Sequence, residues 1–372
     1  MFVETLAKLD YSLRPITTKL PPFYIIHIYS FGRRWFLNRL YNSPPKEKIA
    51  IPKQYNQKIL DIEFQSPIFN AAGIFKEGLG YELAYRQGAG AFLTGTVTPT
   101  YRKGNRKNGF YLPFIPLPNS GTALNWLGLP NDGFEEIARR VQDIEKHSGC
   151  PIGVSIAADP NSKGLEALNG VLRGFEIFST TQTDFIELNE SCPNVPHEHS
   201  ENSSSLIDEK LIERLEWIST NFLKKRKRHL PVIVKFSVDT LYEQVPELVR
   251  LLVYLGFDGV NFGNTSTDYN YYSQFLKGRE KQNFQYFTQK FGGGFSGELL
   301  KSRSLELCKI ANHTLTQLNT KDEFIVIRTG GISTKEDIQE SFENQILLNQ
   351  WFSGYFDNFA KYGHNLYEKI LP

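Results

Sequence analysis

The chain has 372 residues, of which 22% are charged, so it is long enough for one large barrel with an added segment or for two ordinary domains. Its 42 lysines and arginines nearly balance its 40 acidic residues, which argues against a strong general attraction to nucleic acid. Three scattered cysteines argue against a disulfide framework and favour a reducing compartment. No metal-ligand spacing such as CxxC or HExxH occurs, so we expect no metal site.

Residues 1–45 differ in composition from the rest of the chain. Aromatic and aliphatic side chains alternate with arginines over 23–41, and Pro21-Pro22 separates this stretch from an earlier amphipathic one. Such a composition suits a helix in a membrane interface, a helical cap over an apolar tunnel, or a helix packed on the body of the protein. No stretch reaches the ~20 apolar residues of a transmembrane helix. The acid at Glu4 argues against a cleaved signal peptide.

Pro44-Pro45 marks a linker, after which short apolar runs alternate with longer polar segments. Continuous apolar runs predict strands buried on both faces, as in parallel sheets, and segments such as 133–147 and 240–254 have helical periodicity. Eight such units predict an α/β fold, a (β/α)8 TIM barrel over 46–372 with an N-terminal helical extension over 1–45. The predicted strands are 67–73, 91–96, 152–157, 185–189, 232–237, 259–264, 324–331 and 346–353.

The most informative segment, residues 188–194 (LNESCPN), follows the fourth predicted strand. It places the thiol of Cys192 between the carboxamides of Asn189 and Asn194, at a strand end where parallel barrels carry their chemistry. A carboxamide both donates and accepts hydrogen bonds, and a thiol can act as a base or nucleophile. With Asn125 and Asn264, these carboxamides predict a site for a small polar ring such as a cyclic imide or pyrimidine. The alternative is a capped loop with an inert cysteine.

Glycine-rich turns in the later units indicate an anion site. Residues 292–297 (GGGFSG) precede a predicted helix over 299–318, Gly330-Gly331 end the seventh strand, and Ser353-Gly354 end the eighth. Exposed backbone N–H groups at helix N-termini favour anions, and barrels often bind phosphate after strands seven and eight. We therefore expect a phosphorylated cofactor. A Walker A pattern and an early GxGxxG are both absent, which argues against those nucleotide sites.

Two lysines stand at strand ends. Lys235 ends the apolar run of the fifth strand, where burial of a cation is costly unless it faces an anion. A flavin that becomes anionic on reduction would supply that partner, and Lys76 could play a similar part after the first strand. The alternative for each lysine is an ordinary salt bridge.

Together and in this order, these motifs resemble the dihydroorotate dehydrogenases of pyrimidine synthesis, from about Asp61 to Ser353. The matching segments are 70–73 with Lys76, 94–99, 125–133, 189–194, 234–235, 263–265, 293–297 and 329–331. The resemblance implies an FMN-dependent enzyme that oxidises (S)-dihydroorotate to orotate in UMP synthesis, with hydride passing to FMN.

The resemblance also implies roles for individual residues. Cys192 falls on the position of the catalytic base. The residues that would hold the substrate are Lys76, Asn125, Asn189, Asn194, Asn264 and Thr265. The residues that would hold FMN are Ala72, Gly73, Lys76, Thr96, Ser155, Asn189, Lys235, Gly297, Gly330, Gly331, Phe352 and Ser353.

The chain combines features of two classes within this family. Quinone-linked, membrane-associated members usually carry an N-terminal helical extension and a serine base, whereas soluble members carry a cysteine and no extension. Residues 1–45 resemble the first class and Cys192 the second. We expect quinone as the acceptor and a peripheral position on the cytoplasmic side of the membrane. The alternatives are a soluble acceptor (fumarate or NAD) in the cytoplasm, a tRNA-dihydrouridine synthase-like flavoenzyme, and a barrel that only binds a ligand.

Overall fold

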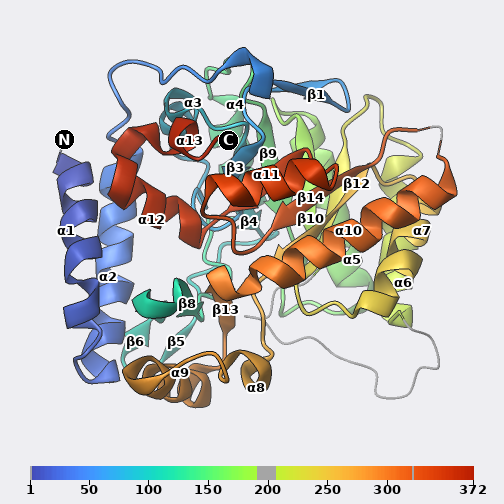
Figure 1. The fold of residues 1–372 in the computed structure, drawn as a ribbon. Helices are drawn as coiled ribbons and strands as arrows, with labels where there is room; N and C mark the ends of the chain where they lie inside the picture. The colour runs from blue at the N-terminus through green and yellow to red at the C-terminus, as the bar shows by residue number, and fades with distance from the viewer. Residues whose placement is uncertain (1, 191–206, 321) are drawn as a thin grey trace.

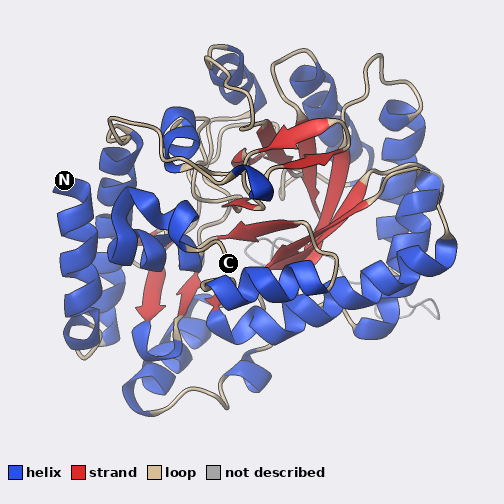
Figure 2. Ribbon diagram, turned by 45° about the horizontal axis from the view of Figure 1, so that its top comes forward, coloured by secondary structure: helices blue, strands red, loops and turns tan. Residues whose placement is uncertain are grey.

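The computed structural model describes residues 2–190, 207–320 and 322–372, and its centre is a sheet of eight parallel strands surrounded by helices (Figures 1 and 2). The strand order is β3-β15-β14-β12-β11-β10-β9-β4. Each predicted apolar run coincides with one of these strands, although β4 extends one residue beyond its run, so the predicted barrel is confirmed. They are β3 (Ile68–Asn70), β4 (Phe92–Val97), β9 (Ile152–Ile156), β10 (Phe185–Asn189), β11 (Val232–Ser237), β12 (Gly259–Asn264), β14 (Ile325–Thr329) and β15 (Leu348–Trp351).

The outer layer consists of amphipathic helices that follow these strands. In α7 the buried residues Val245, Leu248 and Leu252 recur at helical spacing and form the face that packs inward. Gly256 ends this helix in the left-handed conformation, at φ 80°. The layer comprises α3 (Tyr81–Gln87), α4 (Phe134–Gln142), α5 (Gly164–Ser179), α6 (Glu209–Ile218), α7 (Val245–Leu255), α10 (Lys301–Leu318), α11 (Lys335–Glu343) and α12 (Ser353–Tyr362).

Smaller elements lie around the barrel. The hairpin of β1 and β2 packs Ile59, Leu60 and Phe64 against apolar side chains at the amino ends of the barrel strands, and so closes that end. The remaining strands and α-helices are β1 (Gln57–Ile59), β2 (Ile62–Phe64), β5 (Arg106–Lys107), β6 (Phe110–Tyr111), β7 (Phe114–Leu117), β8 (Thr122–Asn125), β13 (Gly294–Gly297), α1 (Phe2–Thr17), α2 (Pro22–Tyr41), α8 (Tyr269–Tyr272), α9 (Gly278–Phe291) and α13 (Leu366–Lys369). Short turns of 3-10 or π helix span Lys53–Tyr55, Pro118–Ser120, Ser219–Leu223, Tyr242–Gln244, Glu298–Leu300 and Gly363–Asn365.

The glycine-rich stretch before α10 differs from the prediction. Gly294–Gly297 was expected in a turn, but it forms strand β13, antiparallel to β8, with Gly294 opposite Asn125. The partner strand lies far earlier in the chain, so no local pattern could indicate the pairing. Glycine is required at 294 because a Cβ there would lie 1.9 Å from Thr265 Oγ1.

The two N-terminal helices lie side by side along one flank of the barrel, next to α12 (Figure 1). Arg14 of α1 forms an ion pair with Asp357 of α12 at 2.6 Å, and the backbone N–H of Phe114 in β7 donates to Ser30 Oγ of α2. The predicted helical extension is therefore present and packs on the body of the protein. None of the helices in the described ranges is long and apolar enough to span a bilayer.

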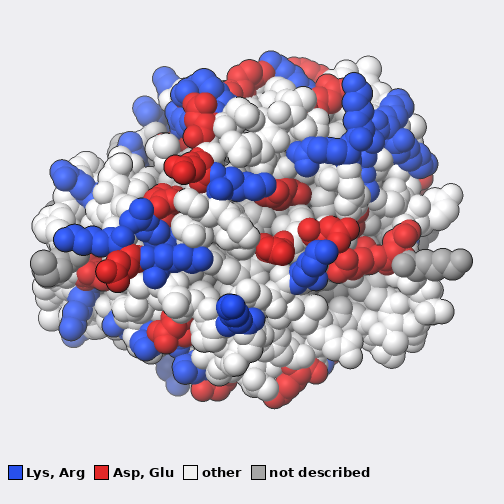
Figure 3. All heavy atoms as spheres, turned by 90° about the horizontal axis from the view of Figure 1, so that it is seen from above, with Lys and Arg blue, Asp and Glu red and all other residues white. Residues whose placement is uncertain are grey.

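The same two helices carry much of the exposed apolar surface. Of the 21 large hydrophobic side chains that are exposed in the described part of the chain, eleven lie between Phe2 and Trp35. The charges elsewhere are mixed: Figure 3 shows lysine and arginine interspersed with aspartate and glutamate on the face seen from above. The helical pair is thus the most apolar exposed region.

The barrel closes between β3 and β4 through a side chain. The carboxamide of Asn70 donates from Nδ2 to the Leu93 carbonyl at 2.6 Å and accepts from the Leu93 N–H at 3.1 Å. It thereby takes the place of a neighbouring strand's peptide group. Beyond it the Gly73 N–H donates to the Gly95 carbonyl at 2.8 Å. Asn70 is fully buried, so Leu93 has no water as an alternative partner.

Replacing Asn70 with alanine should therefore weaken the barrel at this seam. We expect Asn70→Ala to lower the free energy of unfolding by about 3 kcal/mol, because a buried donor and a buried acceptor lose their partners. Urea unfolding followed by tryptophan fluorescence measures the change. Asn270→Ala, at an exposed position of α8, is the matched control and should have little effect. Equal stability of the two variants would contradict the assignment.

Candidate active site

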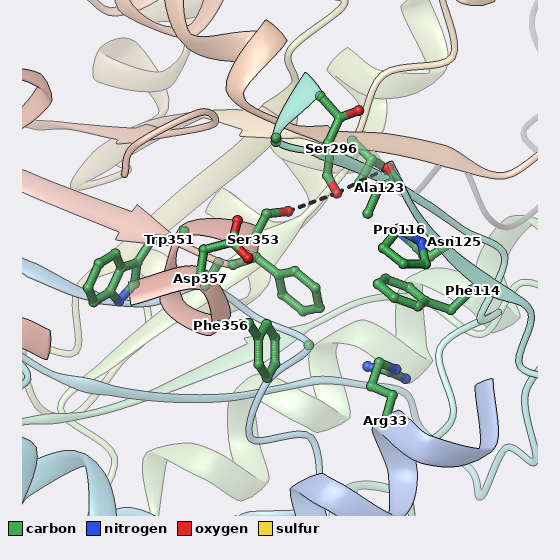
Figure 4. A pocket seen from close by; sticks show the side chains of 18 of the residues that line it. Arg33, Phe114, Pro116, Ala123, Asn125, Ser296, Trp351, Ser353, Phe356 and Asp357 are labelled. Carbon is green, nitrogen blue, oxygen red and sulfur yellow. Dashed lines mark hydrogen bonds between the residues drawn. The ribbon is translucent and has the colours of Figure 1, made fainter. Parts of the chain in front are cut away.

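One large cavity opens at the carboxyl ends of the barrel strands. Its volume is about 620 Å³, within the usual range for a cofactor or substrate site. Residues from the ends of β4, β10, β11, β12 and β14 line one part of it, and residues of α1 and α2 line another. Between these parts lie apolar side chains, among them Phe114, Pro116 and Phe356 (Figure 4). A single space therefore connects the centre of the barrel with the N-terminal helices.

Most of the residues predicted from the sequence line this cavity. Ser155 does not, and its hydroxyl lies behind Thr96 at an Oγ–Oγ1 distance of 3.0 Å. Cys192 and Asn194 lie outside the described residues. The predicted residues that line the cavity are Ala72, Gly73, Lys76, Thr96, Asn125, Asn189, Lys235, Asn264, Thr265, Gly297, Gly330, Gly331, Phe352 and Ser353.

A chain of hydrogen bonds orients the two carboxamides at the ends of β10 and β12. Asn189 donates from Nδ2 to Thr96 Oγ1 at 2.9 Å, and Asn264 donates from Nδ2 to Asn189 Oδ1 at 3.1 Å. Ser155 completes this chain behind Thr96. These contacts hold both carboxamides in fixed orientations before any ligand binds, which lowers the entropic cost of binding one.

Asn125 and Thr265 approach the same space from the small antiparallel sheet and the loop after β12. Asn125 is the last residue of β8, and its Nδ2 lies 3.5 Å from the Gly294 carbonyl of β13. Thr265 Oγ1 is buried without a hydrogen-bond partner among the described residues. A buried hydroxyl without a partner is costly, so this atom is suited to bind a polar ligand in the cavity.

The glycines of the late loops form a cradle that side chains would fill. A Cβ at Gly331 would lie 2.5 Å from the Lys301 backbone nitrogen, and one at Gly354 would lie 2.1 Å from the Ile332 carbonyl oxygen. Ser353 begins α12, so the first N–H groups of that helix have no carbonyl partner within the helix. This combination of close-packed backbone and a helix N-terminus fits a phosphate group.

Lys235 is buried at the base of the cavity, with only 3% of its surface exposed. Its Nζ donates to Gln350 Oε1 at 2.9 Å and lies 3.4 Å from Glu187 Oε1. Burial lowers the pKa of Lys235, and the nearby Glu187 carboxylate counteracts part of that effect. The salt bridge is therefore present, and Lys235 also lines the cavity, while its role towards a flavin stays a prediction.

Three polar residues in the layer of side chains around Lys235 were not identified from the sequence. Glu187, Asn261 and Gln350 lie within predicted strands and are almost completely buried. Their inward direction could have been inferred, because Glu187 stands two positions before Asn189 and side chains alternate along a strand. The sequence could not indicate which strands bring them together.

Arg33 of α2 was also missed as a cavity residue. Its Nε and Nη1 atoms are buried and have no hydrogen-bond partner among the described residues. The guanidinium lies 5.8 Å from the centre of the Phe114 ring and projects towards Phe114 and Phe356 (Figure 4). Burial lowers the pKa of Arg33 to about 10, so it remains charged at neutral pH. Arg14, another arginine of the cavity, is instead paired with two carboxylates.

Comparison with known proteins gives one consistent result. The family model for dihydroorotate dehydrogenase matches residues 54–360. Two relatives carry the name dihydroorotate dehydrogenase (quinone). The one from Idiomarina loihiensis is 24% identical over 298 residues, which cover 80% of this chain and 82% of that protein. The one from Arthrobacter sp. is 27% identical over 305 residues, which cover 79% and 78%.

Solved structures show the same fold. The crystal structure of DHODH from Eimeria tenella in complex with ferulenol has a TM-score of 0.72 at 17% identity, covering 91% of this chain and 89% of that one. The ligand-free form has a TM-score of 0.69 at 18% identity, covering 92% of both chains.

The buried Lys235–Glu187 pair should matter for stability. We expect Lys235→Met to lower the free energy of unfolding by about 3 kcal/mol, because the Glu187 carboxylate is left buried without a cation. The double variant Lys235→Met/Glu187→Gln should recover most of that loss, because no uncompensated charge remains. Urea unfolding of the two variants and the wild type gives the comparison. A double variant as unstable as Lys235→Met would show that the two residues are not energetically coupled.

Proposed function

The chain belongs to the dihydroorotate dehydrogenase family of flavin-dependent oxidoreductases, and from that premise we propose that FMN carries the electrons and that a quinone receives them. The enzyme oxidises dihydroorotate to orotate in pyrimidine biosynthesis. The observation that best supports the quinone is the continuous cavity, which runs from the polar strand ends to the apolar faces of α1 and α2. An apolar acceptor needs such a route.

At the strand ends, the chain's own residues bind the substrate and move a proton. Asn125, Asn189, Asn264 and Thr265 offer donors and acceptors that match the carbonyl and N–H groups of dihydroorotate. Cys192, two residues beyond the last described residue of this segment, is proposed as the base that removes a proton from C5. Lys76 and Asn194 are proposed to bind the substrate as well.

The donor set around the cavity also fits FMN. A bound flavin supplies a two-electron acceptor beside the substrate. Gly297, Gly330, Gly331 and Ser353 suit the phosphate, as argued from the glycine cradle and the start of α12. Lys235 would supply a cation to the negative charge that a bound flavin gains on reduction. Ala72, Gly73, Lys76, Thr96, Asn189 and Phe352 are proposed to contact the ring system, and Ser155 to act through Thr96.

At the other end of the cavity, Arg33 is the proposed anchor for the acceptor. A quinone is apolar except for its carbonyl oxygens, and the buried Nε and Nη1 atoms of Arg33, which have no hydrogen-bond partner among the described residues, are suited to donate to such an oxygen. The surrounding side chains, which include Phe114, Pro116 and Phe356, are apolar. Arg33 would therefore orient the quinone, and the quinone would accept the hydrogen bonds of its buried N–H groups.

The outer face of the N-terminal helices is proposed to meet the membrane surface. Phe2, Ile16, Tyr24 and Phe31 are more than half exposed, and Arg34 and Arg39 stand on the same helix pair. Interfacial helices bind lipid through exposed apolar side chains and basic residues. We therefore propose residues 1–45 as a cap that takes a quinone from the bilayer, and a peripheral position on the cytoplasmic side of the membrane.

The alternatives to this proposal are less well supported. A tRNA-dihydrouridine synthase would need an RNA-binding surface, and the family match over residues 54–360 favours dihydroorotate oxidation instead. The same match argues against a barrel that only binds a ligand. A soluble acceptor, fumarate or NAD, remains the second candidate, because Cys192 resembles the base of soluble members.

The choice of acceptor and the role of Arg33 can be tested together. Purified protein should contain FMN, be reduced by dihydroorotate, and be reoxidised faster by a quinone than by fumarate or NAD. In Arg33→Gln we expect flavin reduction to be unchanged and kcat/KM for the quinone to fall about 10- to 100-fold, because a charge-assisted hydrogen bond is worth roughly 1.5–3 kcal/mol. Stopped-flow measurement of the two half-reactions separates these effects.

The matched control is Arg34→Gln. Arg34 is the next residue of α2, but it is exposed and stacks over the Tyr111 ring at 4.4 Å. This variant should retain the wild-type rate with the quinone in detergent. Faster reoxidation of the wild type by fumarate would refute the quinone proposal, whereas an Arg33→Gln variant with normal quinone kinetics would refute only the role of Arg33.

Cys192 as the base gives a further prediction. We expect Cys192→Ala to bind FMN normally and to lose most of its flavin reduction by dihydroorotate at neutral pH, because the C5 proton then has no acceptor. In the wild type this rate should rise with pH towards the ordinary titration range of a thiol, roughly 8.5. Rapid-reaction measurements across pH test both statements. A variant that is reduced at the wild-type rate would exclude Cys192 as the base.

A further inference from the structure

Glu187 is a buried carboxylate to which the reaction as described assigns no role. It lies on β10 with 1% of its surface exposed, and it does not line the cavity. Its position is one layer below Asn189, inside the barrel. A carboxylate at such a depth is costly, and it persists in a fold only when its partners compensate for the lost water.

The partners of Glu187 come from three other strands of the barrel, of which only β11 is next to β10 in the sheet. Oε2 accepts hydrogen bonds from Gln350 Nε2 at 2.8 Å and Asn261 Nδ2 at 2.9 Å, and Oε1 lies 3.4 Å from Lys235 Nζ. These residues belong to β15, β12 and β11. The carboxylate is thus held by donors on both oxygens, and its position is defined by the barrel itself.

Gln350 connects the carboxylate to the lysine. Its Nε2 donates to Glu187 and its Oε1 accepts from Lys235 Nζ at 2.9 Å, so the two contacts define the orientation of the amide. Thr329 Oγ1 lies 2.8 Å from Asn261 Oδ1 and 3.1 Å from Gln350 Oε1. Side chains from four other strands therefore position the ammonium group of Lys235 at the base of the cavity.

An ammonium group at this depth does not need a carboxylate for hydrogen bonding alone. Neutral amides such as Gln350 would accept its hydrogen bonds, but they would not compensate its charge. Burial favours the neutral form of Lys235, and the carboxylate is the group that counteracts this effect. The other groups of this layer, Asn261, Thr329 and Gln350, are uncharged. Lys76, from the segment after β3, lines the same cavity and carries a like charge.

We propose that Glu187 is a positioning residue that keeps Lys235 charged before the flavin is reduced. This inference rests on the proposed binding of FMN beside Lys235. Two-electron reduction of a flavin to its anionic form takes up two electrons and one proton. If Lys235 were neutral beforehand, the new negative charge would also draw a proton onto its Nζ, and two protons would be taken up. With Glu187 in place, Lys235 is already protonated, so reduction of the flavin takes up only one proton.

The number of protons taken up per two electrons is measured by the pH dependence of the flavin midpoint potential. In the wild type we expect one proton between about pH 7 and pH 9, with no break. In Glu187→Gln the count should rise from one towards two within this range, because the amide no longer supports the charge of Lys235. A merely structural role of Glu187 would not change this count.

Two further variants serve as controls. Asp258→Asn changes another buried carboxylate, which pairs with Arg226 and lies immediately before β12, at the opposite end of the barrel from the cavity. It should keep the wild-type count of one proton. Lys235→Met/Glu187→Gln should also take up one proton, since it lacks the titrating ammonium. An Asp258→Asn count that rises like that of Glu187→Gln would overturn the inference.

The outcomes separate this inference from the proposed function. A flavin-loaded Glu187→Gln variant that still takes up one proton overturns the role of Glu187 alone. A wild-type protein that binds no flavin overturns the proposed function and this inference with it. If Glu187→Gln does not fold, the pH dependence of the wild-type flavin potential is the remaining test. Uptake of a second proton above neutral pH in the wild type would show that Glu187 does not keep Lys235 charged.

Discussion

The constraint on which the rest of this structure depends is that eight parallel strands end at the same rim of a closed barrel. Residues far apart in the sequence, such as Thr96, Asn189 and Asn264, meet there because each is at or near the carboxyl end of its strand. Closure uses backbone hydrogen bonds such as that from Gly73 to Gly95 together with one side chain, since Asn70 supplies to β4 the donor and acceptor that a longer β3 would have supplied. Without closure the cavity would have no fixed wall.

Below this rim, one layer of side chains inside the barrel is polar rather than apolar. The charges of Glu187 and Lys235 cancel, and Gln350 and Asn261 satisfy the remaining hydrogen-bonding atoms. Such a layer contributes little to net stability, because desolvation offsets the Coulomb attraction. Its consequence is positional: it fixes the ammonium group of Lys235 at the base of the cavity.

The N-terminal helices extend the cavity beyond the barrel. They are attached by contacts that include the Arg14–Asp357 ion pair and the Phe114–Ser30 hydrogen bond, so the wall they form is part of the same folded unit. The side chains that they turn towards the cavity include apolar ones such as Leu6 and Phe36 and the charged ones of Asp10, Arg14 and Arg33, and their outer faces expose large hydrophobic side chains. One pair of helices therefore forms a cavity wall on the inside and an exposed apolar surface on the outside.

The sequence by itself determined the barrel and its strands, and most of the site residues predicted from it line the cavity, because apolar runs ending in Asn, Gly, Thr or Lys reflect local chemistry. It did not determine which inward-facing residues meet. The pairing of β13 with β8 and the contacts among Glu187, Asn261 and Gln350 join segments remote in the chain, and only closure of the barrel brings them together. Arg33 likewise resembled any other basic residue of an amphipathic helix, and only tertiary packing buries its Nε and Nη1 atoms without a hydrogen-bond partner among the described residues.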